Sequence, residues 1–353
     1  MQFGLVKSFF TTAQQGIGKR LSFSRVGTMA QKLLLVDADC GIDDAQAIMM
    51  ALAAPHVRIL GITCCFGNTS VENVCRNTLR VLNVCQRTEV PVFCGAACPL
   101  VGTSDLLTSH FGTDGLGDRP EDSDPELWRT QIQREHAVNA MIEMVSQHRG
   151  QVSLVALGPL TNLALAVRMD PTFPQKLKDL FIMGGNMEGK GNRTVCGEFN
   201  FVMDPEAAYV VLEEFSCPTY IATWDFTCRN KLPWEFFDEW VNQDTAAAAF
   251  MKRITSQTYC RDKTTKKDVL FGPGFVSYDS YAMAAAIDSS IMTKNMECSV
   301  RVELQGKLTR GMMALDPVNV LEKKRKAFVM EECDINKFKR LLMAALVQTC
   351  TKH

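Results

Sequence analysis

Four aspartates follow one short apolar run, and this pattern constrains the fold more than any other feature of the chain. Residues 33–36 are Leu-Leu-Leu-Val, and the carboxylates that follow them are Asp37, Asp39, Asp43 and Asp44. Such a run, ended by a glycine at position 41, predicts a buried strand that leads into a loop. Residues 45–54 are strong helix formers and end before a proline, so a helix should follow. Open α/β sheets bind ligands at this edge.

The close spacing of the four carboxylates indicates a bound cation. Asp37 and Asp39 project to the same side of an extended chain. Asp43 and Asp44 fall near a helix N-terminus, where negative charge is favoured. Carboxylates this close repel one another unless a cation or tight hydrogen bonding offsets their charge. Grouped oxygen ligands of this kind suit Ca²⁺ or Mg²⁺.

Helix capping and an EF-hand loop explain the pattern less well. A cap needs one or two aspartates, whereas this segment has four. An EF-hand loop counted from Asp37 places Ile48 at the position where that loop needs a bidentate glutamate. We therefore expect an enzyme site centred on a divalent cation.

Composition restricts the class of protein and its compartment. The chain has 353 residues, 46% of them hydrophobic and 22% charged, which is enough for one large α/β domain or two small ones. Its formal net charge of -1 gives no bulk attraction to nucleic acid or to an anionic membrane. No apolar run is long enough to span a bilayer. The 14 cysteines form no CxxC pair of the kind found in zinc sites, and so many scattered cysteines in a large chain favour a reducing compartment such as the cytoplasm.

The N-terminal segment differs from the rest of the chain. No acidic residue precedes Asp37, and the first 30 residues combine Lys7, Lys19, Arg20 and Arg25 with several serines and threonines. Mitochondrial transit peptides have this composition. A disordered leader, or sequence upstream of a second start at Met29, would look the same. We therefore expect a basic leader over residues 1–30 and one domain over residues 31–348, located in mitochondria if the leader acts as a transit peptide.

Strand-like and helix-like segments alternate along the remaining chain. Strands are expected at residues 57–65, 90–94, 152–157, 180–183 and 219–222, and helices at residues 71–85, 136–148, 163–169 and 205–214. This alternation predicts an α/β domain with a doubly wound, mostly parallel sheet flanked by helices, as in Rossmann-like folds. Residues 300–304 and 326–330 are expected as late edge strands, and residues 335–347 as a final helix.

Two polar segments are predicted as loops. Residues 102–125 are rich in Gly, Asp, Ser, Thr and Pro, and loops of this length in compact domains often serve function. Residues 260–270 have a basic, polar composition that predicts a mobile loop. The wider stretch 253–274 is a candidate for a flexible segment that closes over a ligand. His110, in the first loop, is expected to be a surface or hydrogen-bonded histidine rather than a ligand.

Several expected strands end in polar residues beside glycine. Asn68 follows the second strand, residues 158–162 follow the strand at 152–157, and Asn186 follows the strand at 180–183. Because parallel strands present their carboxyl ends at one edge of the sheet, these groups should converge with the aspartates on one pocket.

Residues 37–45, Asp-Ala-Asp-Cys-Gly-Ile-Asp-Asp-Ala, resemble the DxDPGxDDA signature of inosine-uridine preferring nucleoside hydrolases. Further matching segments follow in the family's order, at residues 66–68, 112–118, 156–162, 183–186 and 198–200, and at Asp279. The resemblance implies the nucleoside hydrolase fold and hydrolysis of the N-glycosidic bond of a ribonucleoside, a small molecule, to ribose and free base. It also implies a tightly bound Ca²⁺ and a homodimer or homotetramer.

The resemblance further implies roles for individual residues. The implied Ca²⁺ ligands are Asp39, Asp44, Asp279 and the backbone carbonyl of Leu157. Asp39 would also be the general base that takes a proton from the attacking water. The implied ribose contacts are Asp43, Asn68, Asn186, Glu198 and Asn200. Asp37 would support the site from behind the ligands.

Two positions depart from the family pattern. The proline of the signature is Cys40 here, which changes backbone stiffness but removes no ligand. The residue before the last metal aspartate is often a histidine proposed to protonate the leaving base, and here it is Tyr278, a weaker acid. Three alternatives follow: Tyr278 donates a hydrogen bond to the base, it stacks on a purine, or hydrolysis is slow.

Two other functions compete with nucleoside hydrolysis. A catalytically weak ribonucleoside-binding protein would keep the metal site and lack efficient protonation of the leaving base. A haloacid-dehalogenase-like Mg²⁺ phosphatase also places Asp-x-Asp after an apolar strand, with Asp37 as its nucleophile. That chemistry gives no role to Asp43 and Asp44 and leaves the later segments unexplained.

Overall fold

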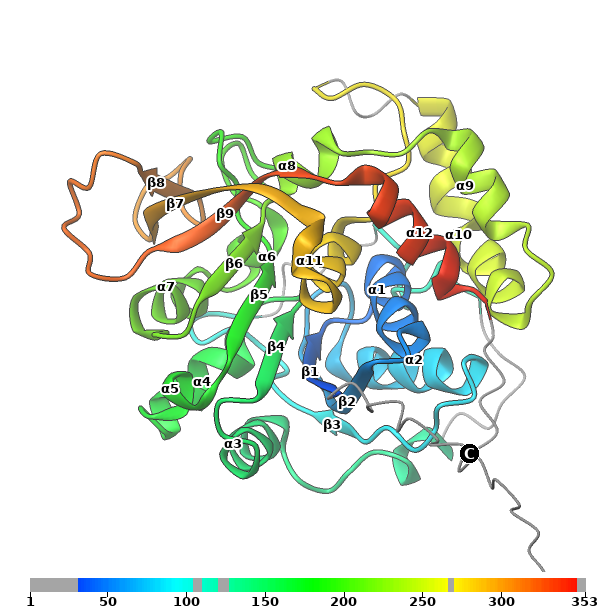
Figure 1. The fold of residues 1–353 in the computed structure, drawn as a ribbon, viewed down its shortest axis with the longest axis horizontal. Coiled ribbons are helices and arrows are strands. Elements are labelled where there is room, and N and C mark those ends of the chain that lie inside the picture. The colour runs from blue at the N-terminus through cyan, green and yellow to red at the C-terminus, as the bar shows by residue number, and fades with distance from the viewer. Residues whose placement is uncertain (1–30, 104–109, 120–126, 266–269, 348–353) are drawn as a thin grey trace, which may run out of the picture. The chain divides into compact units, whose positions relative to one another are not determined.

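The computed structural model describes residues 31–103, 110–119, 127–265 and 270–347, shown in colour in Figure 1. The predicted basic leader, residues 1–30, lies outside this range, as do 104–109, 120–126 and 266–269 within the two predicted loops. Within the described residues, no helix is both long enough and apolar enough to cross a membrane.

A nine-stranded sheet with the order β3-β2-β1-β4-β5-β6-β9-β7-β8 forms the centre of the described region (Figure 1). The strands are β1 (Lys32–Ala38), β2 (Val57–Cys64), β3 (Val92–Cys94), β4 (Val152–Ala156), β5 (Asp179–Met183), β6 (Thr219–Ala222), β7 (Met292–Val302), β8 (Met313–Asp316) and β9 (Ala327–Cys333). The seven strands from β3 to β9 in this order pair in parallel, and β7 pairs antiparallel with both β9 and β8. The predicted mostly parallel α/β sheet is therefore confirmed.

Helices cover both faces of the sheet. The longer ones are α1 (Ile42–Ala53), α2 (Val71–Val84), α3 (Ala137–Gln147), α4 (Thr161–Met169), α7 (Pro205–Glu214), α9 (Trp234–Val241), α10 (Ala246–Thr265), α11 (Tyr278–Ile287) and α12 (Ile335–Ala345). Shorter helices are α5 (Phe173–Lys176), α6 (Phe199–Met203) and α8 (Trp224–Arg229), with 3₁₀ turns at Leu127–Thr130 and Ser289–Ile291.

Alternate side chains of each central strand enter two separate hydrophobic cores. In β1, Leu34 and Val36 pack in a core with residues of α1, α10, α11 and α12, whereas Leu35 packs in a second core with residues of α3, α4 and α7. In β4, Val155 belongs to the first core and Leu154 to the second. This period of two explains why the strands read as continuous apolar runs, since both faces of the sheet are buried.

Three expectations about the elements are wrong. Helix α1 begins at Ile42, three residues before the predicted start, although the expected position of Asp43 and Asp44 near its N-terminus is confirmed. Helix α10 continues to Thr265, into the stretch predicted as a mobile loop and as a flexible segment over a ligand. Strands β7 and β9, both expected as edge strands, are interior strands: β9 lies between β6 and β7, and β7 lies between β9 and β8. The strand at that edge is β8, which was not predicted.

Candidate active site

Most of the predicted residues meet at one cavity. The cavity has a volume of about 360 Å³ and is lined by residues at the ends of β1, β4 and β5 and at the N-terminus of α11. The predicted residues that line it are Asp39, Asp43, Asn68, Leu157, Glu198, Asn200, Tyr278 and Asp279. Its size is near the lower end of the roughly 300–1,000 Å³ common for small-molecule sites.

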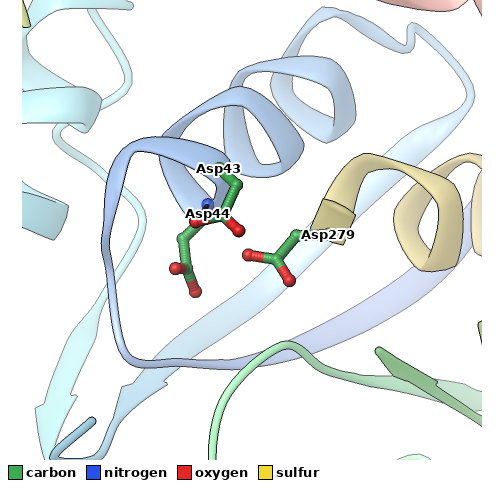
Figure 2. Close-up of side chains that lie close together, drawn as sticks. All are labelled: Asp43, Asp44 and Asp279. Carbon is green, nitrogen blue, oxygen red and sulfur yellow. Dashed lines mark hydrogen bonds between the residues drawn. The ribbon is translucent and has the colours of Figure 1, made fainter. Parts of the chain in front are cut away.

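Three buried carboxylates face one another beside this cavity. Figure 2 shows Asp43 and Asp44 in the first turn of α1, with Asp279 reaching toward them from the first turn of α11. One oxygen from each lies within 4.8 Å of the others, which is a spacing that a single metal ion can bridge. Asp44 is held in place by the backbone N–H of Gly41 at 2.8 Å and that of Asp39 at 3.2 Å. This tight group contains Asp43 in the place where the resemblance implied Asp39.

Asp39 lines the same cavity and is held by a different set of contacts. Its Oδ2 accepts a hydrogen bond of 2.8 Å from the backbone N–H of Asn68, which follows β2. Two glycines leave room for it: a Cβ at Gly67 would overlap the Asp39 carboxylate, and one at Gly158 would lie 2.9 Å from its Cβ and Cγ. The glycines of two sequence segments thus have a physical reason, namely close backbone approach to Asp39.

The carbonyl of Leu157 and the side chains of Asn200 and Glu198 form the wall after β4 and β5. The Asn200 Nδ2 donates to the Leu157 carbonyl at 2.8 Å, which leaves that oxygen a second lone pair for another partner. Glu198 caps the short helix α6: its Oε1 accepts from the Asn200 backbone N–H at 3.0 Å. Its Oε2 accepts from the Gly185 N–H at 2.8 Å.

Asp37 is buried and does not line the cavity, in keeping with the supporting role expected for it. It is held in place by Asn162, a residue for which no role was predicted. The Asp37 Oδ1 accepts hydrogen bonds from the hydroxyl of Thr63 at 2.6 Å and from the Nδ2 of Asn162 at 2.8 Å. Asn162 also donates to the carbonyl of Cys64 at 3.0 Å and accepts from the N–H of Ala96 at 2.9 Å. This single side chain therefore joins the ends of β1 and β2 to the segment after β3.

Asn186 does not line the cavity, unlike the other predicted ribose contacts. Its Nδ2 donates to the backbone carbonyls of Lys190 at 2.8 Å and Cys196 at 2.7 Å. Its Oδ1 accepts from the backbone N–H of Met313 in β8 at 3.0 Å. The amide is thus used to fold the loop that follows β5 and to attach it to β8.

The site contains more buried carboxylates than buried positive groups, and burial together with this excess raises their pKa values. Burial, and then repulsion from the neighbouring carboxylates, raises the pKa values of Asp39, Asp43 and Asp279 well above their usual range. Burial also raises the pKa of Asp37 to about 7 and that of Glu198 to about 7. A hard divalent cation would offset this charge, and the oxygen donors present are the type that such a cation binds. The carboxylates of Asp43, Asp44 and Asp279 therefore fit a site for a divalent cation.

Sequence reasoning missed the aromatic wall of the cavity. It consists of Phe111, Phe199, Trp224, Trp234 and Tyr259, in addition to Tyr278. These residues come from five separate segments, so no local spacing indicated that they would meet. His110, Asn192 and Arg193 also line the cavity. His110 is exposed, as expected, and yet lies at this site.

Comparison with known proteins identifies the family. Residues 34–340 match the family model described as inosine-uridine preferring nucleoside hydrolase. The inosine-uridine preferring nucleoside hydrolase of Crithidia fasciculata is 32% identical over 316 residues, which are 89% of this chain and 97% of that protein.

Solved structures agree with the sequence comparisons. A plant nucleoside hydrolase superposes with a TM-score of 0.80 at 27% identity, covering 90% of this chain and 99% of the other. An inosine-guanosine nucleoside hydrolase gives a TM-score of 0.80 at 30% identity with the same coverage. These matches leave no place for a dehalogenase-like phosphatase. The chain therefore belongs to the inosine-uridine preferring nucleoside hydrolase family and is a nucleoside hydrolase, an enzyme that cleaves the N-glycosidic bond of ribonucleosides.

Proposed function

We propose that this cavity hydrolyses purine and pyrimidine ribonucleosides to ribose and free base with the help of Ca²⁺ and with Asp39 as the general base. The observation that carries this proposal is the group of buried carboxylates at the floor of the cavity, set among hydrogen-bonding side chains and aromatic rings. Carboxylates bind the cation and the sugar, and aromatic rings bind the base.

The proposed Ca²⁺ ligands are Asp39, Asp44, Asp279 and the carbonyl of Leu157. When bound, Ca²⁺ would supply positive charge that holds the attacking water and ribose hydroxyls and favours loss of a proton from the water. Asp43 lies against Asp44 and Asp279 and is assigned to the ribose hydroxyls beside the ion. Asn68, Glu198 and Asn200 would complete the ribose contacts from the cavity wall.

Asp39 would receive the proton of the attacking water. Its Oδ2 is fixed by the Asn68 N–H, so its carboxylate is oriented before substrate binds. As the bond to the base breaks, the ribose ring becomes cationic, and the surrounding carboxylates stabilise that charge as it develops. The departing base gains a proton. Tyr278, in the first turn of α11, would contact the base either by donating a hydrogen bond or by stacking on it.

The proposed ribose contacts give a definite substrate preference. Removing the 2′-hydroxyl would leave buried carboxylate and amide groups without their partner. We therefore expect 2′-deoxyribonucleosides to be poor substrates, whereas inosine and uridine are the first ribonucleosides to test.

The direct test is base release from inosine, uridine, adenosine and cytidine by the full chain in Ca²⁺. Asp39→Ala should lower kcat by at least about 100-fold, the usual contribution of a general base. Asp244→Ala removes an exposed carboxylate and serves as the matched control, expected to keep full activity. Circular dichroism should show that both variants are folded.

Two results would contradict the proposal in different ways. Full activity of Asp39→Ala would refute the general-base assignment while leaving the hydrolase intact. No base release by the unsubstituted chain, with Ca²⁺ bound, would favour the catalytically weak ribonucleoside-binding protein.

A further inference from the structure

Helix α1 contains one buried amide side chain in an otherwise apolar stretch. After Asp43 and Asp44, the only polar residue of this helix is Gln46, and its side chain is completely buried. Its neighbours along the chain, Ala45 and Ala47, are buried as well. Because an amide loses its hydrogen bonds to water when it is buried, its polar atoms need partners within the protein. The partners of Gln46 therefore indicate what this residue holds in place.

Both polar atoms of the Gln46 amide bind residues outside α1. The Nε2 donates a hydrogen bond of 3.3 Å to the hydroxyl of Tyr259, which lies in α10. The Oε1 accepts a hydrogen bond from the hydroxyl of Ser277, the residue that precedes α11. A further hydrogen bond of 2.6 Å joins the hydroxyls of Ser277 and Ser280. One side chain of α1 thus connects this helix to both α10 and the start of α11.

The two partners of Gln46 belong to the aromatic side of the cavity. Tyr259 is buried and lines the cavity. Ser277 lies between Val276 and Tyr278, and both of these neighbours line the cavity. In the proposed function, aromatic rings bind the base, whereas the carboxylates bind the ion and the ribose. Gln46 therefore holds parts of the wall that would meet the base.

We propose that Gln46 is a positioning residue for base recognition: by fixing Tyr259 and Ser277, it sets where the rings of Tyr259 and Tyr278 meet the base. This inference rests on the proposed function and adds a residue that acts through its partners, since Gln46 does not itself line the cavity. A misplacement of about 1 Å by a change away from the reacting atoms can cost about 100-fold in rate. Both rings remain when Gln46 is replaced, so we expect a smaller effect, of about tenfold.

The test measures base release from inosine and uridine by the full chain in saturating Ca²⁺. Gln46→Met keeps the approximate size of the side chain and removes both hydrogen bonds, so it should raise KM by about tenfold and change kcat by less than about threefold. A purely structural role would reduce the fraction of active enzyme, which lowers the apparent kcat and leaves KM unchanged. Gln147→Met removes an exposed amide on α3 and is the matched control, expected to leave both constants unchanged.

Inhibition by the product ribose separates the sugar side of the site from the base side. Ribose has no base, so its inhibition constant reports on the contacts to the ion and the sugar alone. This constant should stay within about twofold in Gln46→Met. An equal rise in the inhibition constant of ribose and in KM for inosine would overturn the inference, because Gln46 would then act on the carboxylates beside it.

Variants of the two partners test the inference even if Gln46→Met does not fold. Tyr259→Phe removes only the hydroxyl that Gln46 binds, and Ser277→Ala removes the other partner; each should raise KM by about threefold or more. Combining Gln46→Met with Tyr259→Phe should raise KM by less than the product of the separate increases, because both changes break the same hydrogen bond.

Two kinetic results would contradict the inference and leave the proposed function standing. One is an unchanged KM in folded Gln46→Met, and the other is an unchanged KM in both Tyr259→Phe and Ser277→Ala. No base release by the unsubstituted chain would instead refute the proposed function and this inference together.

Discussion

Asn162 is the residue whose replacement should most clearly reveal how the site is supported. Its side chain makes three hydrogen bonds, to the Asp37 carboxylate, the Cys64 carbonyl and the Ala96 N–H, and it is completely buried. Asn162→Leu leaves these three groups without that partner. A buried polar group left unpaired costs about 1–3 kcal/mol. Because neighbours in one network do not add, we expect a total loss of about 3–5 kcal/mol in the free energy of unfolding.

Asn162→Asp separates the electrostatic part of this effect from the packing part. The variant keeps the shape and the acceptor for Ala96, but it replaces the donor facing Asp37 with a carboxylate oxygen. Burial already raises the pKa of Asp37 to about 7, and the new carboxylate should also titrate above the value of about 4 that it has when unfolded. The folded state then retains a proton that the unfolded state has released, so stability falls as pH rises between these values.

The magnitude follows from the same linkage. Each extra proton retained by the folded state costs about 1.4 kcal/mol per pH unit, so Asn162→Asp should lose about 3 kcal/mol more than the unsubstituted chain between pH 5 and pH 7. Urea unfolding followed by circular dichroism, at both pH values and with a chelator present, measures this difference. Asn139 lies exposed in the first turn of α3, and Asn139→Asp and Asn139→Leu are the matched controls, expected to change stability by less than about 1 kcal/mol. Equal pH slopes for Asn162→Asp and the unsubstituted chain would refute the reasoning.

Three further predictions concern a cap, an aromatic residue and the metal. Asp204 caps α7 by accepting from the Ala207 N–H at 2.9 Å, and it also accepts from the Thr161 hydroxyl at 2.6 Å. Asp204→Ala should therefore lower the free energy of unfolding, measured in urea, by about 2–4 kcal/mol, and a loss below about 1 kcal/mol would contradict this. Tyr278→Phe keeps the aromatic ring at the cavity and should retain kcat/KM within about threefold, whereas Tyr278→Ala should lose about tenfold or more. A large loss of kcat in Tyr278→Phe would instead indicate that the Tyr278 hydroxyl donates a proton to the base. Removing Ca²⁺ from a solution at 100 times its Kd should cost about 2.7 kcal/mol, and this difference should vanish in Asp279→Asn.

The elements that sequence predicted well are those whose pattern is local. Strand β6 (Thr219–Ala222) and helix α7 (Pro205–Glu214) have the predicted limits, because apolar runs and a proline at the first helical position mark them. Helix α10 was not predicted, although Phe250, Met251 and Ile254 in its first half and Tyr259 in its second half are buried. The polar sequence that follows carries no helical period, and sequence alone therefore indicates a loop.

The interior position of β9 has a different cause. Strand order depends on which surfaces meet across the sheet, and β8 completes the edge by pairing with β7 over four residues only. A four-residue strand with one exposed and one partly buried position between two buried ones shows no alternation of buried and exposed residues. Fold class followed from the alternation of elements, whereas the arrangement of the last strands did not.

Within the site, sequence indicated the donors but could not assign all their partners. Asn186 carries the side chain expected of a ribose contact, but a folded loop surrounds it with backbone acceptors and uses its amide internally. Conversely, Asn162 lies in a segment that matches the family pattern, but no role was predicted for it. Its three hydrogen-bond partners come from three different strand regions, which the sequence does not show to be adjacent. The hydrogen-bond partners of such side chains depend on which distant segments come into contact, and residue spacing along the chain does not show this.

The cluster of Asp43, Asp44 and Asp279 combines local stabilisation with repulsion between distant segments. Asp43 and Asp44 lie in the first turn of α1 and Asp279 in the first turn of α11, so each carboxylate is favoured by the positive end of its own helix. The Asp44 carboxylate is bound as well by the N–H groups of Gly41 and Asp39. These local interactions hold the carboxylates in place although they repel one another across the cluster. We therefore expect the chain to fold without the ion, with Ca²⁺ adding stability to a site that the two helix starts have already formed.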